Sequence, residues 1–168
     1  MEKLWAPWRM KYVQNTDSCE GGCVFCLEEG CDDIKCRILQ RGKHAFVIMN
    51  IYPYNNGHLL IAPYRHTADL AGLTPEEKLE IMELLGLWTK ILKKAMSCHG
   101  FNVGANLGRI AGAGIADHLH FHIVPRWNGD TNFMPVIGNT KVLPESLEDC
   151  YCQLREKLLE FADGQSGQ

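Results

Sequence analysis

Three histidines alternate with apolar residues in the second half of the chain, at His118, His120 and His122. Successive side chains of a strand point to opposite faces, so a predicted strand over 118–124 places the three imidazoles on one face. Imidazole is a metal ligand, an acid–base group near neutral pH and a nucleophile. The row therefore indicates either a metal site or catalysis by imidazole itself, with a solvated strand face as the bland alternative.

A run of small residues directly precedes the histidines. Residues 108–114 read Gly-Arg-Ile-Ala-Gly-Ala-Gly. Backbone N–H groups can approach a ligand closely in such a segment, and several of them together suit phosphate oxygens. A flexible hairpin connection explains the same residues equally well. Beside the histidine row, the run favours phosphate chemistry.

The chain has eight cysteines, of which Cys23 and Cys26 form a Cys-x-x-Cys pair. The pair indicates metal binding but is incomplete, because a structural zinc ion takes four nitrogen or sulfur ligands. Cys19, Cys31 and Cys36 are close enough in sequence to compete as thiolate ligands. The first residues do not resemble a signal peptide, so we expect a cytoplasmic protein whose cysteines bind metal or stay reduced rather than form structural disulfides.

Strands and helices must position these residues, and their signals follow one another along the chain. Thr74-Pro75-Glu76-Glu77 starts a helix, because Thr74 can cap it, Pro75 suits its first turn and Glu77 completes a capping box. Apolar residues then recur at helical spacing until Gly100. The other predicted elements are strands over 44–49, 58–62, 101–107 and 118–124 and a helix over 144–162. This order predicts an α+β fold, an antiparallel sheet with one long central helix and a C-terminal helix.

Length and composition predict one globular domain with a real core. The chain has 168 residues, of which 46% are hydrophobic and 22% charged. A net charge of −3 gives no reason to expect a nucleic-acid partner, and no segment has the length of a membrane span. We expect a single domain with an N-terminal extension (1–19), a core (20–130), a C-terminal segment with its helix (131–162) and a disordered tail (163–168).

Several motifs together resemble one family. The segment His118-Leu-His-Phe-His-Ile-Val124 resembles the signature of the histidine triad (HIT) superfamily. The Cys-Val-Phe-Cys segment at 23–26, Asn-Gly-His-Leu-Leu-Ile-Ala-Pro at 56–63 and Pro-Arg-Trp at 125–127 match in order and spacing. The resemblance covers roughly residues 20–130. Residues 4–12 and 127–133 resemble a narrower bacterial and archaeal branch that includes diadenosine tetraphosphate phosphorylases.

The resemblance implies a HIT-like fold and a nucleotide hydrolase or nucleotidyltransferase that acts on an α-phosphate. It implies that His120 attacks phosphorus and forms a nucleotidyl-histidine intermediate. His122 is then expected to contact the phosphate or leaving group and to assist proton transfer. His118 completes the catalytic row.

The resemblance also implies contacts with an adenine nucleotide. His58 matches a histidine near the phosphates, and Asn50 matches a position that binds ribose hydroxyls, with Asn106 a weaker candidate of the same type. Phe46 and Ile48 are expected either to sandwich the base or to pack in the core. Backbone groups of four residues are expected to line the phosphate pocket: Gly112, Ala113, Gly114 and Ile115.

Zinc-bearing relatives imply a structural zinc site made of Cys23, Cys26, His66 and His118. No catalytic metal is expected at His120. The resemblance to the family also implies a homodimer formed through the long helix and its neighbouring strand.

The sequence does not decide whether water or phosphate accepts the nucleotidyl group. The expected reaction is hydrolysis or phosphorolysis of nucleoside polyphosphates of the diadenosine tetraphosphate type, or of nucleotide conjugates. Three alternatives remain. They are a purine nucleoside phosphoramidase, a nucleotide-binding adaptor with little catalysis, and a metal-dependent hydrolase that uses all three histidines as ligands.

Overall fold

The computed structural model describes residues 23–27, 30–131, 137 and 142–165, so the predicted extension over 1–19 lies outside the described residues. The described elements follow in the order β1 (Ile38–Arg41), β2 (Ala45–Met49), β3 (Leu59–Pro63), α2 (Pro75–Met96), β4 (Gly100–Ala105), the short 3₁₀ helix η2 (Arg109–Ala111), β5 (Phe121–Arg126) and α4 (Leu147–Gln165). The strands form a five-stranded sheet in the order β1-β2-β3-β5-β4, and every neighbouring pair is antiparallel. The predicted α+β class is confirmed.

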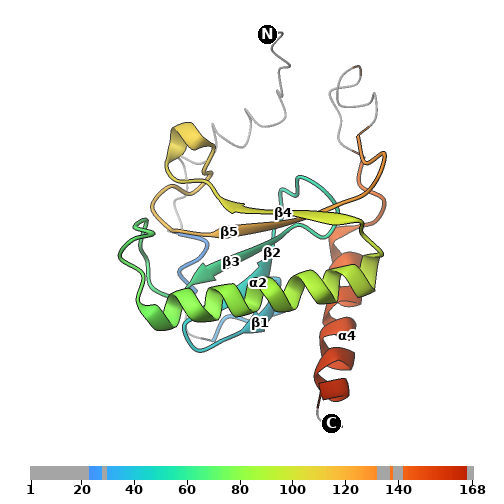
Figure 1. Ribbon diagram of the computed structural model, residues 1–168, viewed down its shortest axis with the longest axis horizontal. Coiled ribbons are helices and arrows are strands. Elements are labelled where there is room, and N and C mark those ends of the chain that lie inside the picture. Colours follow the sequence, from blue (N-terminus) through green and yellow to red (C-terminus); the bar gives the residue numbers. More distant parts are fainter. Residues whose placement is uncertain (1–22, 28–29, 132–136, 138–141, 166–168) are drawn as a thin grey trace.

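Helix α2 lies along one face of the sheet, and α4 contacts α2 and β1 (Figure 1). Alternate residues of the strands, such as Val47, Ile61 and Ile123, are fully buried in the main core beneath α2. Trp88 of α2 is also fully buried, and its indole N–H donates to Gln40 Oε1 over 2.7 Å. Each fully buried aliphatic side chain here stabilises the fold by about 1.5–3 kcal/mol.

The opposite face of the sheet carries a smaller core, formed by Phe25, Phe46, Leu60 and Ala62. His122 pairs in register with Leu60 of β3 and therefore points to this second face. The histidine row thus lies on the side of the sheet away from α2, while the apolar residues between the histidines face the main core.

Helix α2 begins as predicted and ends earlier. The Thr74 side chain accepts from the Glu77 N–H group, and the Glu77 side chain accepts from the Thr74 N–H group, so the capping box is present. The helix stops at Ser97, which adopts a left-handed conformation with φ of 49°, and its N–H group donates to Lys93 O. Gly100 opens β4 instead of ending the helix.

The predicted strand over 118–124 also differs, because its ladder begins only at Phe121. The last pair with β3 is Ile61–Phe121, and the chain before it leaves the sheet. Leu119 N–H instead donates to Thr67 O over 2.7 Å, which keeps this segment extended without a strand partner. The histidines therefore still alternate in direction with their neighbours, although only His122 belongs to β5.

Two further differences concern the ends of the described region. Strand β1 was not predicted, because four residues directly after a cysteine-rich loop carry a weak signal. Helix α4 begins at Leu147, after Ser146, whose hydroxyl accepts from the Asp149 N–H group. It runs to Gln165, so 163–165 are helical although the sequence predicts a disordered tail there. No helix among the described residues is long and apolar enough to cross a membrane.

Candidate active site and metal centre

His120 is oriented by a backbone carbonyl. Its Nδ1–H group donates to His118 O over 2.8 Å, which assigns the ring proton to Nδ1 and leaves the lone pair on Nε2. Burial lowers the pKa of His120, and the bond to the carbonyl offsets this only in part. His120 is thus a neutral imidazole at pH 7, with its nucleophilic nitrogen defined by the hydrogen bond of the other one.

A second pair of histidines lies beside it. The backbone N–H group of Tyr54 donates to His58 Nδ1 over 3.0 Å, so the His58 proton is on Nε2. His58 Nε2 lies 2.9 Å from His122 Nδ1 and donates to it. This assigns the His122 proton to Nε2. Burial, followed by the neighbouring His122 and His120, lowers the pKa of His58 to about 3, so His58 stays neutral and keeps this order of protons.

Asn50 lies beside the His58–His122 pair, and its side-chain amide forms hydrogen bonds within the protein. Its Nδ2 lies 3.2 Å from His58 Nδ1, and its Oδ1 accepts from the Tyr52 N–H group over 2.9 Å. Each of these polar atoms retains one further hydrogen-bonding position. Asn50 thus orients His58, a role that the sequence reasoning missed, and the ribose contact stays a prediction.

Two aromatic rings bound the histidine row, and sequence reasoning assigned neither a role. The Tyr54 ring packs against His58 and His122, with ring centroids 4.7 and 5.6 Å apart. At the other end, the Phe25 ring lies 5.3 Å from the His118 ring and 4.8 Å from the His120 ring. The sequence signal that could have identified Phe25 is its position between the two cysteines of the Cys-x-x-Cys pair.

The four residues predicted as metal ligands lie together. Cys23 Sγ is 3.3 Å from His118 Nδ1, and Cys26 Sγ is 3.2 Å from His66 Nδ1. All four ligand atoms are within 4.8 Å of one another. His118 Nε2 lies 2.9 Å from Pro63 O and donates to it, so the Nδ1 lone pair faces the sulfur atoms. Two thiols and two imidazoles at this spacing fit a tetrahedral zinc ion.

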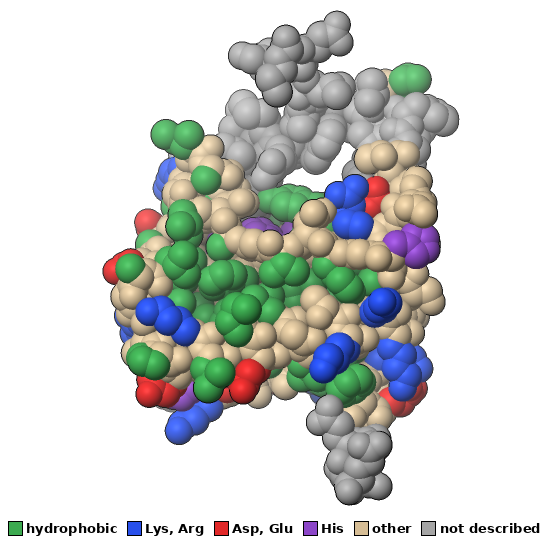
Figure 2. Space-filling view, viewed as in Figure 1, with side chains coloured by type: hydrophobic (Ala, Val, Ile, Leu, Met, Phe, Trp, Pro, Cys, Tyr) green, Lys and Arg blue, Asp and Glu red, His purple; other side chains and the backbone are tan. Residues whose placement is uncertain are grey.

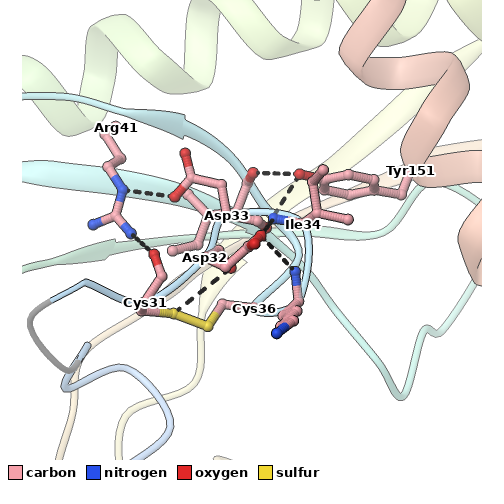
Figure 3. The surroundings of a disulfide bond; sticks show 9 residues. Cys31, Asp32, Asp33, Ile34, Cys36, Arg41 and Tyr151 are labelled. Atoms are coloured by element: carbon pink, nitrogen blue, oxygen red, sulfur yellow. Dashed lines mark hydrogen bonds and ion pairs between the residues drawn. A yellow bond between two sulfur atoms is a disulfide. The ribbon is translucent and has the colours of Figure 1, made fainter.

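Cys31 and Cys36, the predicted competitors for the metal, are joined in a disulfide (Figure 3). The expectation that they stay reduced or bind metal is therefore wrong for this pair. Their loop is held by Asp33, which accepts from Arg41 Nε over 2.8 Å. Pairing removes both sulfur atoms as competing thiolates, while Cys19 lies outside the described residues.

The remaining described cysteines are Cys98, Cys150 and Cys152, all free thiols outside the cluster. Burial, followed by the charge of Glu145, raises the pKa of Cys150 to about 12. This thiol is protonated at neutral pH and therefore unreactive. Cys152 lies on the exposed side of α4. The Cys-x-x-Cys pair thus stands apart from the other described cysteines in having imidazole neighbours.

Part of the glycine-rich loop is closed on itself. Gly112 N–H donates to Arg109 O over 2.9 Å, and Ala113 N–H donates to Gly108 O over 3.3 Å. Gly108 and Gly112 have φ of 83° and 94°, values that favour glycine and explain why the loop needs it at these points. The N–H groups of Gly112 and Ala113 are therefore engaged in the turn, although the sequence predicts them as phosphate donors. Gly114 and Ile115 follow this turn.

The other residues predicted to contact the nucleotide have different environments in the structure. Asn106 Nδ2 donates to Gly112 O over 3.4 Å, so this amide braces the loop. Ile115 packs against the smaller core that contains Phe25, on the histidine side of the sheet. Phe46 is fully buried in that core, which favours packing over the alternative that it sandwiches a base, and Ile48 packs against it.

Comparison with known proteins shows which proteins this chain resembles. A family model described as "HIT domain" matches residues 32–129. The chain is 39% identical over 156 residues to an "AP-4-A phosphorylase" of Mycobacterium tuberculosis, covering 89% of this chain and 80% of that protein. It is 36% identical over 107 residues to an adenosine 5'-monophosphoramidase of Schizosaccharomyces pombe, covering 63% and 75%. A crystal structure of a zinc-bound histidine triad family protein from Mycobacterium smegmatis has a TM-score of 0.66 at 23% identity, covering 89% and 99%.

The family match and the 39% identity to a named enzyme show a nucleotide hydrolase or nucleotidyltransferase. The chain belongs to the HIT domain family. Its resemblance to the branch that contains the AP-4-A phosphorylase is confirmed by an identity that extends over most of the chain.

Proposed function

We propose that this protein transfers a nucleotidyl group from a nucleoside polyphosphate through His120. Its Nε2 lone pair attacks the α-phosphorus and forms a P–N bond, while the P–O bond to the polyphosphate leaving group breaks. His122 Nε2–H faces the leaving oxygen and supplies a hydrogen bond or proton. Water or inorganic phosphate then attacks phosphorus, and the P–N electrons return to His120. The observation that carries this proposal is the 2.8 Å hydrogen bond from His120 Nδ1–H to His118 O, because it leaves the lone pair of the nucleophile on Nε2.

The groups around the nucleophile receive roles within this proposal. His58 keeps His122 in the tautomer that presents its N–H group, as supported by the 2.9 Å distance between their nitrogens. The backbone N–H groups of Gly114 and Ile115 stabilise the phosphoryl oxygens as charge builds up. The remaining amide position of Asn50 binds the ribose hydroxyls.

We propose diadenosine tetraphosphate as the substrate, on the basis of the identity to the M. tuberculosis enzyme. Inorganic phosphate is the proposed acceptor for the same reason. The second candidate is an adenosine phosphoramidate, supported by the similarity to the S. pombe phosphoramidase. Both reactions pass through the same covalent intermediate on His120, and both are expected in the cytoplasm, where adenine nucleotides are made and used.

Product analysis tests the reaction. Diadenosine tetraphosphate is incubated with and without inorganic phosphate, and the nucleotides are separated by ion-exchange chromatography. ADP and ATP formed only with phosphate support phosphorolysis, whereas AMP and ATP support hydrolysis. His120→Ala should yield neither, and an exposed control, Cys152→Ser, should match the wild type. Tight AMP binding without product from either substrate class contradicts the proposal and favours an adaptor.

We propose that Cys23, Cys26, His66 and His118 bind one structural zinc ion, which would cross-link the cysteine segment to the histidine row. The donor set and its spacing support this proposal. Metal analysis should find about one zinc per chain in the wild type and in Cys152→Ser. Cys26→Ser should lose the metal. Metal retained by Cys26→Ser, or a metal-free wild type purified without chelators, contradicts the proposal.

We also propose a homodimer formed through α2 and β4. Hydrophobic side chains gather along α2 and the adjoining sheet edge (Figure 2). Met82 of α2 and Val103 of β4 are 64% and 50% exposed, and β4 is the last strand of the sheet. An apolar face beside an open strand edge suits a second copy of the same chain. Met82→Glu should shift sedimentation toward monomer, whereas Leu159→Glu on α4 should not, and equal masses for both variants contradict this interface.

A further inference from the structure

The ring of Phe25 connects the metal-ligand cluster to the catalytic row. Phe25 lies between the ligands Cys23 and Cys26 and is only 3% exposed. Its ring contacts His118, a predicted ligand, and lies 4.8 Å from His120 at an interplanar angle of 31°. One side chain thus touches both the metal site and the proposed nucleophile.

Few other contacts hold the segment that carries this ring. Within residues 23–27 the backbone bond is local, from Cys26 N–H to Cys23 O over 2.9 Å. Among the described residues, the hydrogen bonds that join this segment to the rest of the chain are those of its two thiols with His66 and His118. Besides these, Phe25 is buried in the smaller core, and Cys23 and Leu27 pack against that core. Ligand bonds from Cys23 and Cys26 to a metal would therefore strengthen the hold on the segment that carries Phe25.

The orientation of the His120 ring depends on the side chains that pack against it. The hydrogen bond to His118 O orients Nδ1, and the remaining freedom of the ring is a small rotation about its Cβ–Cγ bond. The neighbouring ring of His122 lies 5.1 Å away at 63° and bounds one side. Phe25 bounds the ring as well, with the closer and more nearly parallel contact. A small misorientation of a nucleophile costs a large factor in rate, because attack requires alignment with the phosphorus.

We propose that Phe25 is a positioning residue that couples metal occupancy of the Cys23, Cys26, His66 and His118 cluster to the orientation of the His120 ring. Metal binding docks the Cys-x-x-Cys segment, and the docked segment presses Phe25 against the nucleophile. This inference rests on the proposed function for the role of His120. It adds that the metal acts on catalysis through a packed aromatic ring, at a distance from the reacting phosphorus.

A matched control separates this role from general packing. Phe46 belongs to the same small core and is fully buried, but its ring contact is with Tyr64, at a centroid distance of 5.2 Å. Phe25→Leu and Phe46→Leu remove the same atoms from one cluster. Only the first removes a ring that touches His120.

The first measurement is the single-turnover rate at which zinc-loaded protein forms nucleotidyl-histidine from diadenosine tetraphosphate. Metal content is determined in parallel, and Phe25→Leu should keep its zinc because all four ligands remain. We expect Phe25→Leu to slow the covalent step about ten-fold while substrate affinity changes little. Phe46→Leu should stay within about two-fold of the wild type. Equal rates for the two variants overturn the proposal.

The second measurement does not depend on turnover. Diethyl pyrocarbonate carbethoxylates accessible imidazoles, and peptide fragmentation by mass spectrometry reports the extent at His120. Zinc removal should speed modification of His120 in the wild type and in Phe46→Leu. In Phe25→Leu the reaction should be fast with or without zinc. The coupling is overturned if zinc removal does not change the carbethoxylation rate of His120 in the wild type. It is also overturned if His120 in Phe25→Leu reacts as slowly as in the zinc-loaded wild type.

The two measurements separate this inference from the proposed function. If no nucleotidyl-histidine forms in the wild type with any nucleotide, the proposed function fails, while the carbethoxylation rates still test the coupling. If the wild type forms the intermediate and Phe25→Leu forms it at the same rate, the proposed function stands and the coupling fails.

Discussion

The buried imidazole of His58 should make the protein unstable in acid. Its pKa is lowered from 6.5 to about 3 in the folded protein, chiefly by burial. The fold therefore favours the neutral ring, and unfolding allows it to take up a proton. For a histidine whose pKa is lowered on folding, the stabilising effect is complete above pH 6.5 and is lost progressively as the pH falls toward 3.

The size of the effect follows from these two pKa values. At pH 5 nearly every unfolded molecule carries a proton on this histidine, whereas almost no folded molecule does. With 1.36 kcal/mol for each pH unit of difference, the free energy of unfolding should fall by about 2 kcal/mol between pH 7.5 and pH 5 through this residue alone.

His58→Gln provides the test, because glutamine does not titrate and its amide can still donate to His122. Urea unfolding at pH 7.5, 6 and 5 measures the free energy. The variant should be less stable at pH 7.5, since the Tyr54 N–H group loses its acceptor. Its loss of stability on going to pH 5 should be about 2 kcal/mol smaller than that of the wild type.

The control is a variant destabilised without loss of a titrating group. Thr74→Ala removes the cap of α2 but leaves His58 in place, so its stability should be lower at each pH while the loss due to His58 on going to pH 5 remains. Metal concentration is held equal throughout, so that titration of the ligands cancels in the comparison. If His58→Gln and the wild type lose stability in parallel, the structure does not hold His58 neutral, and the assigned tautomers of His58 and His122 lose their basis.

Three further predictions address the nucleophile and the fold. His120→Ala should lower kcat/KM by about 10³-fold or more while circular dichroism stays that of the wild type, and substantial residual activity would place the nucleophile elsewhere. Thr74→Ala should cost about 1 kcal/mol in urea unfolding, and no loss would mean that the cap does not stabilise α2. Tyr151→Phe should cost about 1–2 kcal/mol, because its hydroxyl reaches Asp33 O and Ile38 O within 3.1 Å, and unchanged stability would show that water replaces these contacts.

Local features of the chain could be predicted from sequence because they depend on neighbouring residues. The capping box at Thr74 and Glu77 is a contact across three residues, and the apolar periodicity of α2 reflects one helix. The histidine row likewise signals its shared face through alternation alone. The ends of helices were less predictable than their interiors. Ser97 ends α2 in a left-handed backbone conformation that serine does not favour.

The sequence by itself determined the fold class, the family and the identity of the candidate nucleophile and metal ligands, because motif and period are local properties. Only the tertiary structure decided which nitrogen of each imidazole carries the proton. For His118 and His122 the proton depends on partners far along the chain, since Pro63 is 55 positions from His118 and His58 is 64 positions from His122. The docking of Phe25 on His120 was likewise decided by packing across a sheet, where register and burial bring together side chains that no local pattern relates.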